Sequence, residues 1–184
     1  MVNQTIFTME NITRTKQILQ IMYVLTWIAF VGLMIETGAI LVSYVVSCIN
    51  PGAAENMYKD LKLGELRALS IWQFTLSVSY TAAISGMKAF VLFLVIKALS
   101  KVNLANPFTV EVAAILERIS YILSGIWIVA VVNNQHAGWL LKRTAIHSET
   151  FSSEEFIFMA RLVFIISQVF KRGVEIQSEN DLTV

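Results

Sequence analysis

Long apolar runs separated by short polar stretches dominate the pattern of hydrophobic and polar positions along this chain. The first two runs cover residues 18–49 and 71–99, with Glu36 inside the first and Lys88 inside the second. A helix rises about 1.5 Å per residue, so about 20 apolar residues cross a hydrocarbon core of about 30 Å. Both runs therefore predict helices that span a membrane.

Two shorter apolar runs follow. The third covers residues 112–132 and ends in the polar stretch 133–135. The fourth, residues 156–170, reaches the length of a membrane span only if it includes flanking residues. Asn106 before Pro107 is a pattern typical of a helix start, and Ser152 with Glu155 three residues later matches a capping box.

These patterns predict an all-α fold, an integral membrane bundle of four transmembrane helices in a single domain. The predicted spans are residues 18–46, 71–99, 111–132 and 153–172. The N-terminal segment 1–17 and the C-terminal tail 173–184 are predicted to lie outside the membrane. Lys and Arg near the span ends favour, by a narrow margin, a cytoplasmic position for both termini.

Composition narrows the functional classes. The chain is 56% hydrophobic and 15% charged, more apolar than ordinary soluble domains, which are about 45–50% apolar and about 25% charged. A formal net charge of +1 gives no reason to expect direct binding of nucleic acid. A single cysteine cannot supply a Cys-rich metal site, and the spacing of His136 and His147 does not favour one. We find no catalytic motif and expect a non-enzymatic protein without metal or cofactor.

Polar side chains in the predicted spans follow helical spacing. In the second span they recur at i, i+4, i+8 and i+11, which places them on one helical face. In the first span Glu36 shares a face with Ser43 and Ser47. The nine candidates for intramembrane ion pairs or ligand contacts are Glu36, Ser77, Thr81, Ser85, Lys88, Glu117, Arg118, Arg161 and Gln168.

We expect these faces to turn inward, because charge exposed to lipid costs several kcal/mol. Glu36 is predicted to pair with Lys88 or Arg161. With Arg118, the predicted interior holds three cations, and with Glu117 it holds two carboxylates. The interior therefore has one positive charge in excess, which favours an anionic ligand. A purely structural role in helix register and a ligand or ion site remain equal alternatives.

The end of the chain, residues 165–184, and the Asn-Pro-Phe-Thr segment at 106–109 carry a family resemblance. They resemble DUF2975, a family of bacterial four-span membrane proteins of unknown function. The resemblance implies no activity, cofactor or catalytic residue. Members are often encoded beside small helix-turn-helix regulators. The resemblance therefore implies a protein of the bacterial inner membrane that senses a signal and acts on a cytoplasmic DNA-binding partner.

The C-terminal tail is consistent with such a partner. Gly173 is predicted to end the last helix in a left-handed conformation, after two basic residues that complement the helix dipole. The acidic residues beyond it form either a solvated terminus or a docking segment. The candidates for partner binding are Lys171, Arg172, Gly173, Glu175, Glu179 and Asp181.

Two functional hypotheses follow. The first is a membrane sensor or regulator that acts through a partner protein. The second is a small dimeric ion-coupled transporter in which Glu36 titrates and Lys88 or Arg161 binds the counter-charge. In either case the partners include the lipid bilayer, and a homo-oligomer is compatible with both.

Overall fold

A computed structural model describes residues 2–50, 66–67, 70–102 and 107–181 of the chain. The four long helices are α1 (Val2–Ile49), α4 (Ile71–Lys101), α5 (Val110–Thr144) and α6 (Ser153–Asp181). This confirms the predicted all-α bundle. Among the described helices, α1 from Arg14, α4 and α5 are long and apolar enough to cross a membrane. The apolar stretch of α6 contains Arg161 and runs directly into two basic residues, so a fourth span stays a prediction.

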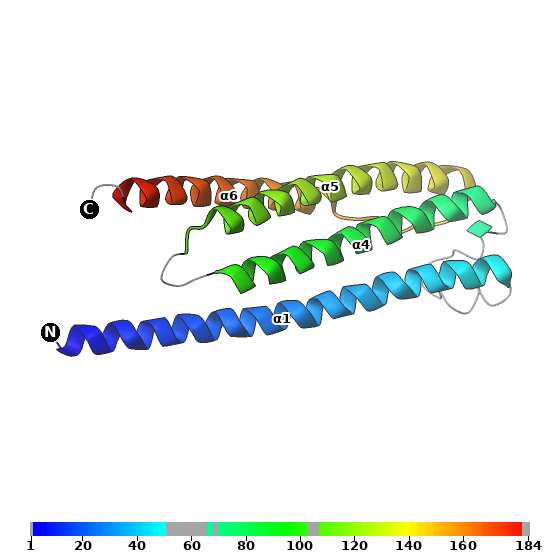
Figure 1. Ribbon diagram of the computed structural model, residues 1–184. Coiled ribbons are helices and arrows are strands. Elements are labelled where there is room, and N and C mark those ends of the chain that lie inside the picture. Colours follow the sequence, from blue (N-terminus) through cyan, green and yellow to red (C-terminus); the bar gives the residue numbers. More distant parts are fainter. Residues whose placement is uncertain (1, 51–65, 68–69, 103–106, 182–184) are drawn as a thin grey trace.

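The helices pack in chain order. Among the described helices, α1 contacts only α4, α4 also contacts α5, and α5 also contacts α6. Figure 1 shows α1 along one side of the molecule, α4 in the middle, and α5 with α6 along the other side. Phe156 of α6 also reaches Lys88 of α4, but Arg161 and Gln168 of α6 are exposed, so the expectation that all four polar faces meet at one centre is wrong.

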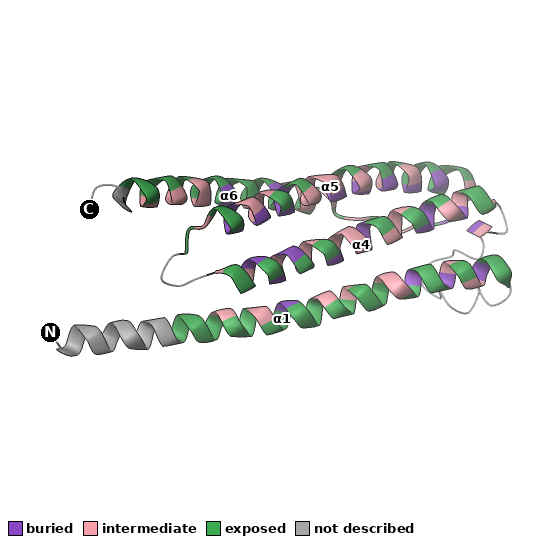
Figure 2. Cartoon of the chain, in the orientation of Figure 1, coloured by how far each residue is buried: buried purple, intermediate pink, exposed green. Residues whose placement is uncertain are grey.

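Burial follows this order. Figure 2 shows the described part of α1, from Arg14 onward, to be mostly exposed, whereas buried residues recur along α4 and α5. One core joins α4 to α5, with residues of α6 packed against it, and a second joins α1 to α4 and α5 near the carboxyl end of α1. The first contains Ile84, Leu94, Ala98, Ile115, Ile119, Ile126 and Ala130, and the second Ile40, Leu66, Phe74, Val78, Leu140 and Ile146.

Side-chain and backbone hydrogen bonds set the ends of α5. The cap at its start is Thr109, whose hydroxyl accepts from the Val112 N–H at 3.3 Å, and the predicted cap Asn106 lies outside the described residues. The helix does not end at the polar stretch 133–135 but continues to Thr144. It ends where Ala145 adopts a left-handed conformation with φ 56°.

The start of α6 agrees with the sequence, and its end does not. The helix begins at Ser153, as predicted, and the N–H of Glu155 donates to the backbone carbonyl of Ser152, which is not the side-chain bond of the predicted capping box. It continues without a break through Gly173 to Asp181. The prediction that Gly173 ends the helix is wrong, because no described glycine has a positive φ.

Candidate functional site: a charged cluster beneath the connection between α5 and α6

The segment that connects α5 to α6, residues 145–152, turns back along α5 (Figure 1). Two consecutive amide side chains of α5 hold it there. The Asn133 Nδ2 donates to the carbonyl of Glu149 at 2.8 Å. Asn134 donates to the carbonyl of Phe151 at 2.7 Å and accepts from its N–H at 2.9 Å. Because Asn134 lies ten residues before Thr144, the segment returns about 15 Å along the helix.

This return explains why the polar stretch 133–135 does not end α5. Backbone polar groups that are shielded from water need hydrogen-bond partners within the protein. The side chains of Asn133 and Asn134 replace three of the hydrogen bonds that the connecting segment needs, while their own backbone stays helical. The two amides are therefore positioning residues, and their adjacency within an apolar helix is the sequence signal for them.

The connecting segment carries a carboxylate into the bundle. Glu149 is half-buried and interacts electrostatically with Lys88 of α4 and Glu36 of α1. Burial raises the pKa of Glu149, and the charge of Glu36 raises it further. The ammonium of Lys88 and the hydroxyl of Thr81 act in the opposite direction without reversing the shift. Sequence reasoning missed Glu149 because a residue in a connection shares no helical face with the others.

Aromatic rings cover Lys88 on the side of α6. Its Nζ atom lies 5.2 Å from the ring centre of Phe151 and 5.3 Å from that of Phe156. Such cation–π contacts stabilise an ammonium that has lost part of its hydration. Lys88 thus connects α4 with the connecting segment and with the first turn of α6.

Glu36 reaches the same region from α1. The Ser85 hydroxyl donates to the Glu36 Oε1 at 3.2 Å, although the side chain of Glu36 is otherwise exposed. The predicted direct ion pairs are not formed, since no described carboxylate oxygen lies within 4.0 Å of a Lys88 or Arg161 nitrogen. We refer to Glu36, Lys88 and Glu149 as the charged cluster.

The polar stripe of α4 faces its neighbouring helices as the spacing predicts. Ser77 and Ser85 are buried, and Thr81 and Lys88 are half-buried. The Ser77 hydroxyl oxygen has no hydrogen-bond partner. The stripe therefore supplies the α4 side of the charged cluster.

The other predicted cations do not join it. Arg118 and Arg161 are both exposed, and so is Gln168, whose amide donates to the Ser167 hydroxyl at 3.3 Å. The predicted excess of positive charge is therefore wrong for the described interior. The charged cluster holds two carboxylates and one ammonium, a formal charge of −1 when all three groups are ionised.

A second charged contact joins α5 to α6 nearer to the chain termini. The Nζ of Lys171 lies 2.8 Å from the Glu117 Oε1, which also accepts a hydrogen bond from the Tyr121 hydroxyl at 3.3 Å. Glu117 is thus paired with a residue that the sequence assigned to the tail. This ion pair is electrically balanced and holds the two helices in register.

Gly173 has a packing role in place of the predicted terminating role. A Cβ atom at this position would lie 2.6 Å from Cδ1 of Phe108, which precedes α5, so glycine is needed for the close approach. The Phe108 ring also meets the Phe170 ring, with centres 5.2 Å apart. The two segments on which the family resemblance rests therefore contact each other.

The remaining tail candidates lie on the last turns of α6. Arg172 donates to the Glu175 Oε2 at 2.6 Å, and Glu179 acts on the same guanidinium through its charge. Arg172, Glu175 and Glu179 are exposed. The acidic tail is therefore a charged helical extension as far as Asp181.

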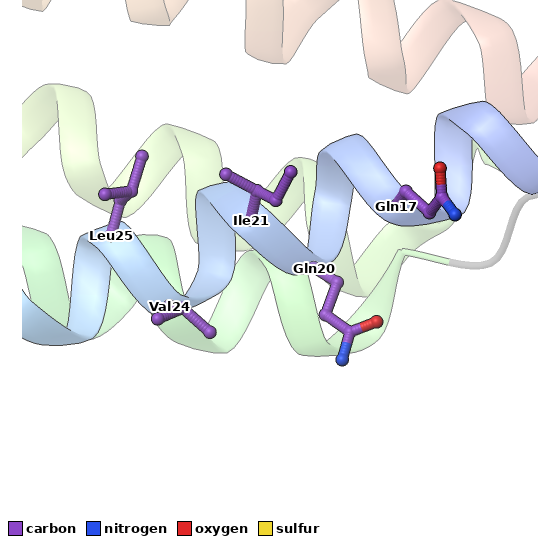
Figure 3. A pocket seen from close by; sticks show the side chains of 5 residues that line it. All are labelled: Gln17, Gln20, Ile21, Val24 and Leu25. Atoms are coloured by element: carbon purple, nitrogen blue, oxygen red, sulfur yellow. The ribbon is translucent and has the colours of Figure 1, made fainter.

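Other polar features lie away from the cluster. His136 Nε2 is 2.7 Å from Gln73 Oε1, and no three potential metal ligands come together among the described residues. A pocket of about 430 Å³ lies against the first half of α1, before Glu36 in the chain, and Figure 3 shows side chains that line it. Its described lining residues are Gln17, Gln20, Ile21, Val24 and Leu25.

The comparisons with known proteins identify the family. The chain belongs to DUF2975, a family of proteins of unknown function, whose model matches residues 50–184. The match includes Lys88, Glu149 and both positioning asparagines, whereas Glu36 on α1 lies before it. No curated protein and no solved structure matches the chain.

Proposed function

We propose that this chain is a non-enzymatic membrane sensor that regulates a cytoplasmic partner protein. In this proposal the charged cluster receives the signal, and the last turns of α6 transmit it. The supporting observation is covalent continuity, because the connecting segment that carries Glu149 leads directly into α6 at Ser153. A change at the cluster therefore acts on the start of the helix whose other end carries the tail.

The contacts along α6 supply a mechanical route. Lys88 touches Phe151 and Phe156, so a change in charge at the cluster alters how the first turn of α6 rests on α4. A continuous helix moves as a rigid element over this length. At its far end, the ion pair of Glu117 with Lys171 and the contact of Phe108 with Gly173 fix the tail against α5.

The tail has the chemistry of a docking surface for a basic partner. Glu175 and Glu179 are four residues apart on a helix and share one exposed face. A small DNA-binding regulator, the kind of partner that the family resemblance implies, presents a basic surface to which an acidic helix is complementary. The amino end of α1 and the carboxyl end of α6 lie at the same end of the molecule (Figure 1), which supports placing both termini in the cytoplasm of a bacterial cell.

Affinity purification from native membranes tests this proposal. We compare the full chain with a variant that ends at Val174, which keeps the Glu117 ion pair and the Gly173 contact intact. We expect the full chain to recover a small DNA-binding protein and the shortened chain to lose it. The matched control, Glu154→Gln, removes an exposed carboxylate at the opposite end of α6 and keeps the partner.

Two results would overturn the proposal. One is recovery of the same proteins with and without residues 175–184. The other is a partner whose target transcripts do not respond when the tail is removed.

A further inference from the structure

Three separate elements deliver the groups of the charged cluster. Glu149 comes from the connecting segment, Lys88 from α4 and Glu36 from α1. The charged groups that act on Glu149 are these other two. From α5 the segment is held by the neutral amides of Asn133 and Asn134, and α6 adds the apolar ring of Phe156 over Lys88.

The charge of the cluster does not balance. One ammonium faces two carboxylates, so one negative charge is left without a counter-charge, and the half-buried Glu149 has lost part of its hydration although Glu36 is exposed. An excess charge on a partly dehydrated group is costly, and the usual response of a protein is to neutralise the group. Adding one proton to a carboxylate brings the cluster to zero.

A proton suits the cluster better than a metal ion. The position between the carboxylates is already influenced by a cation, the ammonium of Lys88, which two aromatic rings hold in place. The Glu149 carbonyl, a further oxygen that a metal ion would use, already accepts a hydrogen bond from Asn133. A proton can bind to the carboxylate without displacing the Lys88 ammonium or breaking the hydrogen bond to the Glu149 carbonyl.

Glu149 is the better acceptor of the two carboxylates. Its side chain is half-buried, whereas that of Glu36 is exposed and accepts a hydrogen bond from Ser85. When Glu149 becomes a neutral acid, the ammonium of Lys88 still interacts with the carboxylate of Glu36 and with the rings of Phe151 and Phe156. The pair that remains is balanced.

We propose that Glu149, Lys88 and Glu36 form a proton-binding site in which the Glu149 carboxylate takes up the proton. The inference rests on the proposed function, because it names the signal that the sensor receives. The proton adds to one carboxylate oxygen, no other bond changes, and the net charge of the site rises from −1 to zero. The attraction between Glu149 and Lys88 is then lost, whereas the hydrogen bonds of Asn133 and Asn134 and the contact of Phe151 with Lys88 remain.

Infrared difference spectroscopy of the purified full chain in lipid nanodiscs tests this site over a series of pH values. We expect a protonated carboxyl band that titrates above the ordinary range of glutamate and is absent from Glu149→Gln. This substitution keeps the side-chain shape and the backbone carbonyl that Asn133 binds. The control variant Glu154→Gln, five residues away and exposed, should leave the band and its midpoint unchanged.

Substitutions of Glu36 and Lys88 should shift the midpoint of the Glu149 titration in opposite directions. Glu36→Gln removes a negative charge and should move the midpoint to lower pH, whereas Lys88→Met removes a positive charge and should move it to higher pH. The inference is overturned if Glu149→Gln leaves the titrating band in place, or if either shift has the opposite sign. A midpoint that moves with the concentration of Na⁺ or K⁺ would instead assign the site to a metal cation and would equally refute it.

Stability provides a second readout that does not depend on a spectral band. A carboxyl group whose pKa is raised by folding binds its proton more tightly in the folded state. The unfolding temperature should therefore fall as pH rises from the ordinary glutamate range through the raised pKa of Glu149, and Glu149→Gln should remove this part of the dependence. A pH dependence identical in the two proteins would contradict the proton site.

The two proposals fail separately. The titration of Glu149 is measured without a partner protein. If Glu149 titrates as expected but the same proteins are purified with and without the tail, the regulator is refuted and the proton site remains. A proton-coupled carrier would give this result. Tail-dependent purification with no titration at Glu149 refutes only the proton site.

Discussion

The charged cluster and the ion pair of Glu117 with Lys171 differ in balance and in position. Glu117 and Lys171 form a single pair at 2.8 Å between two adjacent helices. The charged cluster gathers two carboxylates and one ammonium from three elements, and none of its nitrogen–oxygen distances is within 4.0 Å. The pair of Glu117 with Lys171 has no net charge, whereas the charged cluster has a formal charge of −1.

This difference separates two uses of charge in an apolar chain. A balanced pair fixes the register of its helices and gains nothing from a ligand. An unbalanced group held by neutral amides responds to proton concentration, because its charge is not fixed by a neighbour. Glu117 therefore supports the fold, and Glu149 is the group at which we propose that the proton binds.

The strongest way to break this comparison is to release the segment that carries Glu149. Asn134→Ala removes two hydrogen bonds and leaves the N–H and the carbonyl of Phe151 without partners. Each orphaned buried group costs about 1–3 kcal/mol, so we expect a loss of about 3 kcal/mol in unfolding free energy. Hydrogen exchange over residues 145–152 should rise strongly in the same variant.

Gln135→Ala is the matched control for this change. Gln135 is exposed and directly adjacent on the same helix, so its removal should alter neither stability nor exchange. Equal exchange in the two variants would show that Asn134 does not hold the segment.

A smaller effect is expected where α6 meets the start of α5. Gly173→Ala places a methyl group 2.6 Å from the ring of Phe108, and the ring must move. Overpacking of this kind costs about 1–3 kcal/mol, from which the better helix propensity of alanine recovers about 1 kcal/mol. We expect a net loss of about 1 kcal/mol, measured by thermal unfolding in detergent.

Two further variants sharpen this prediction. Phe108→Leu, combined with Gly173→Ala, should restore part of the lost stability by making room. Gly138→Ala meets no atom within 4 Å and should stabilise the helix instead. A Gly173→Ala variant that behaves like Gly138→Ala would mean that the close contact is unimportant.

The smallest effect is expected at the balanced pair itself. Glu117→Gln should lower the unfolding temperature slightly at low salt, and the difference should shrink as salt screens the pair. Glu175→Gln, which breaks an exposed pair within α6, should have no measurable effect. Thermal unfolding at two salt concentrations distinguishes them, and a salt-independent loss would show that Glu117 acts through packing.

Helical periodicity explains how much of the site could be predicted. The stripe from Ser77 to Lys88 recurs at helical spacing, so the sequence reveals that these residues share one face of α4. The same rule places Glu36 on one face of α1 with Ser43 and Ser47, but its hydrogen bond with Ser85 of α4 does not follow from the period. The fold class needed only the length and apolarity of the runs.

The parts that sequence reasoning missed depend on contacts between distant segments. Glu149 lies in a connection, where no period applies, and its position follows from hydrogen bonds of two asparagines about sixteen residues earlier. The role of Gly173 depends on Phe108, which no local rule places beside it. Local signals gave a helix terminus for Asn133 and for Gly173, and tertiary packing overrode both.

The single-neighbour packing of α1 has a consequence for the surrounding membrane. Its apolar part, from Arg14 to Ile49, covers 36 residues, or about 54 Å, and exceeds a hydrocarbon core of about 30 Å. Such a helix adapts to bilayer thickness by tilting, and only α4 restrains it among the described helices. We therefore expect membrane thickness to change the distance between Glu36 and Lys88, so that the lipid composition of the membrane alters the charge balance of the cluster.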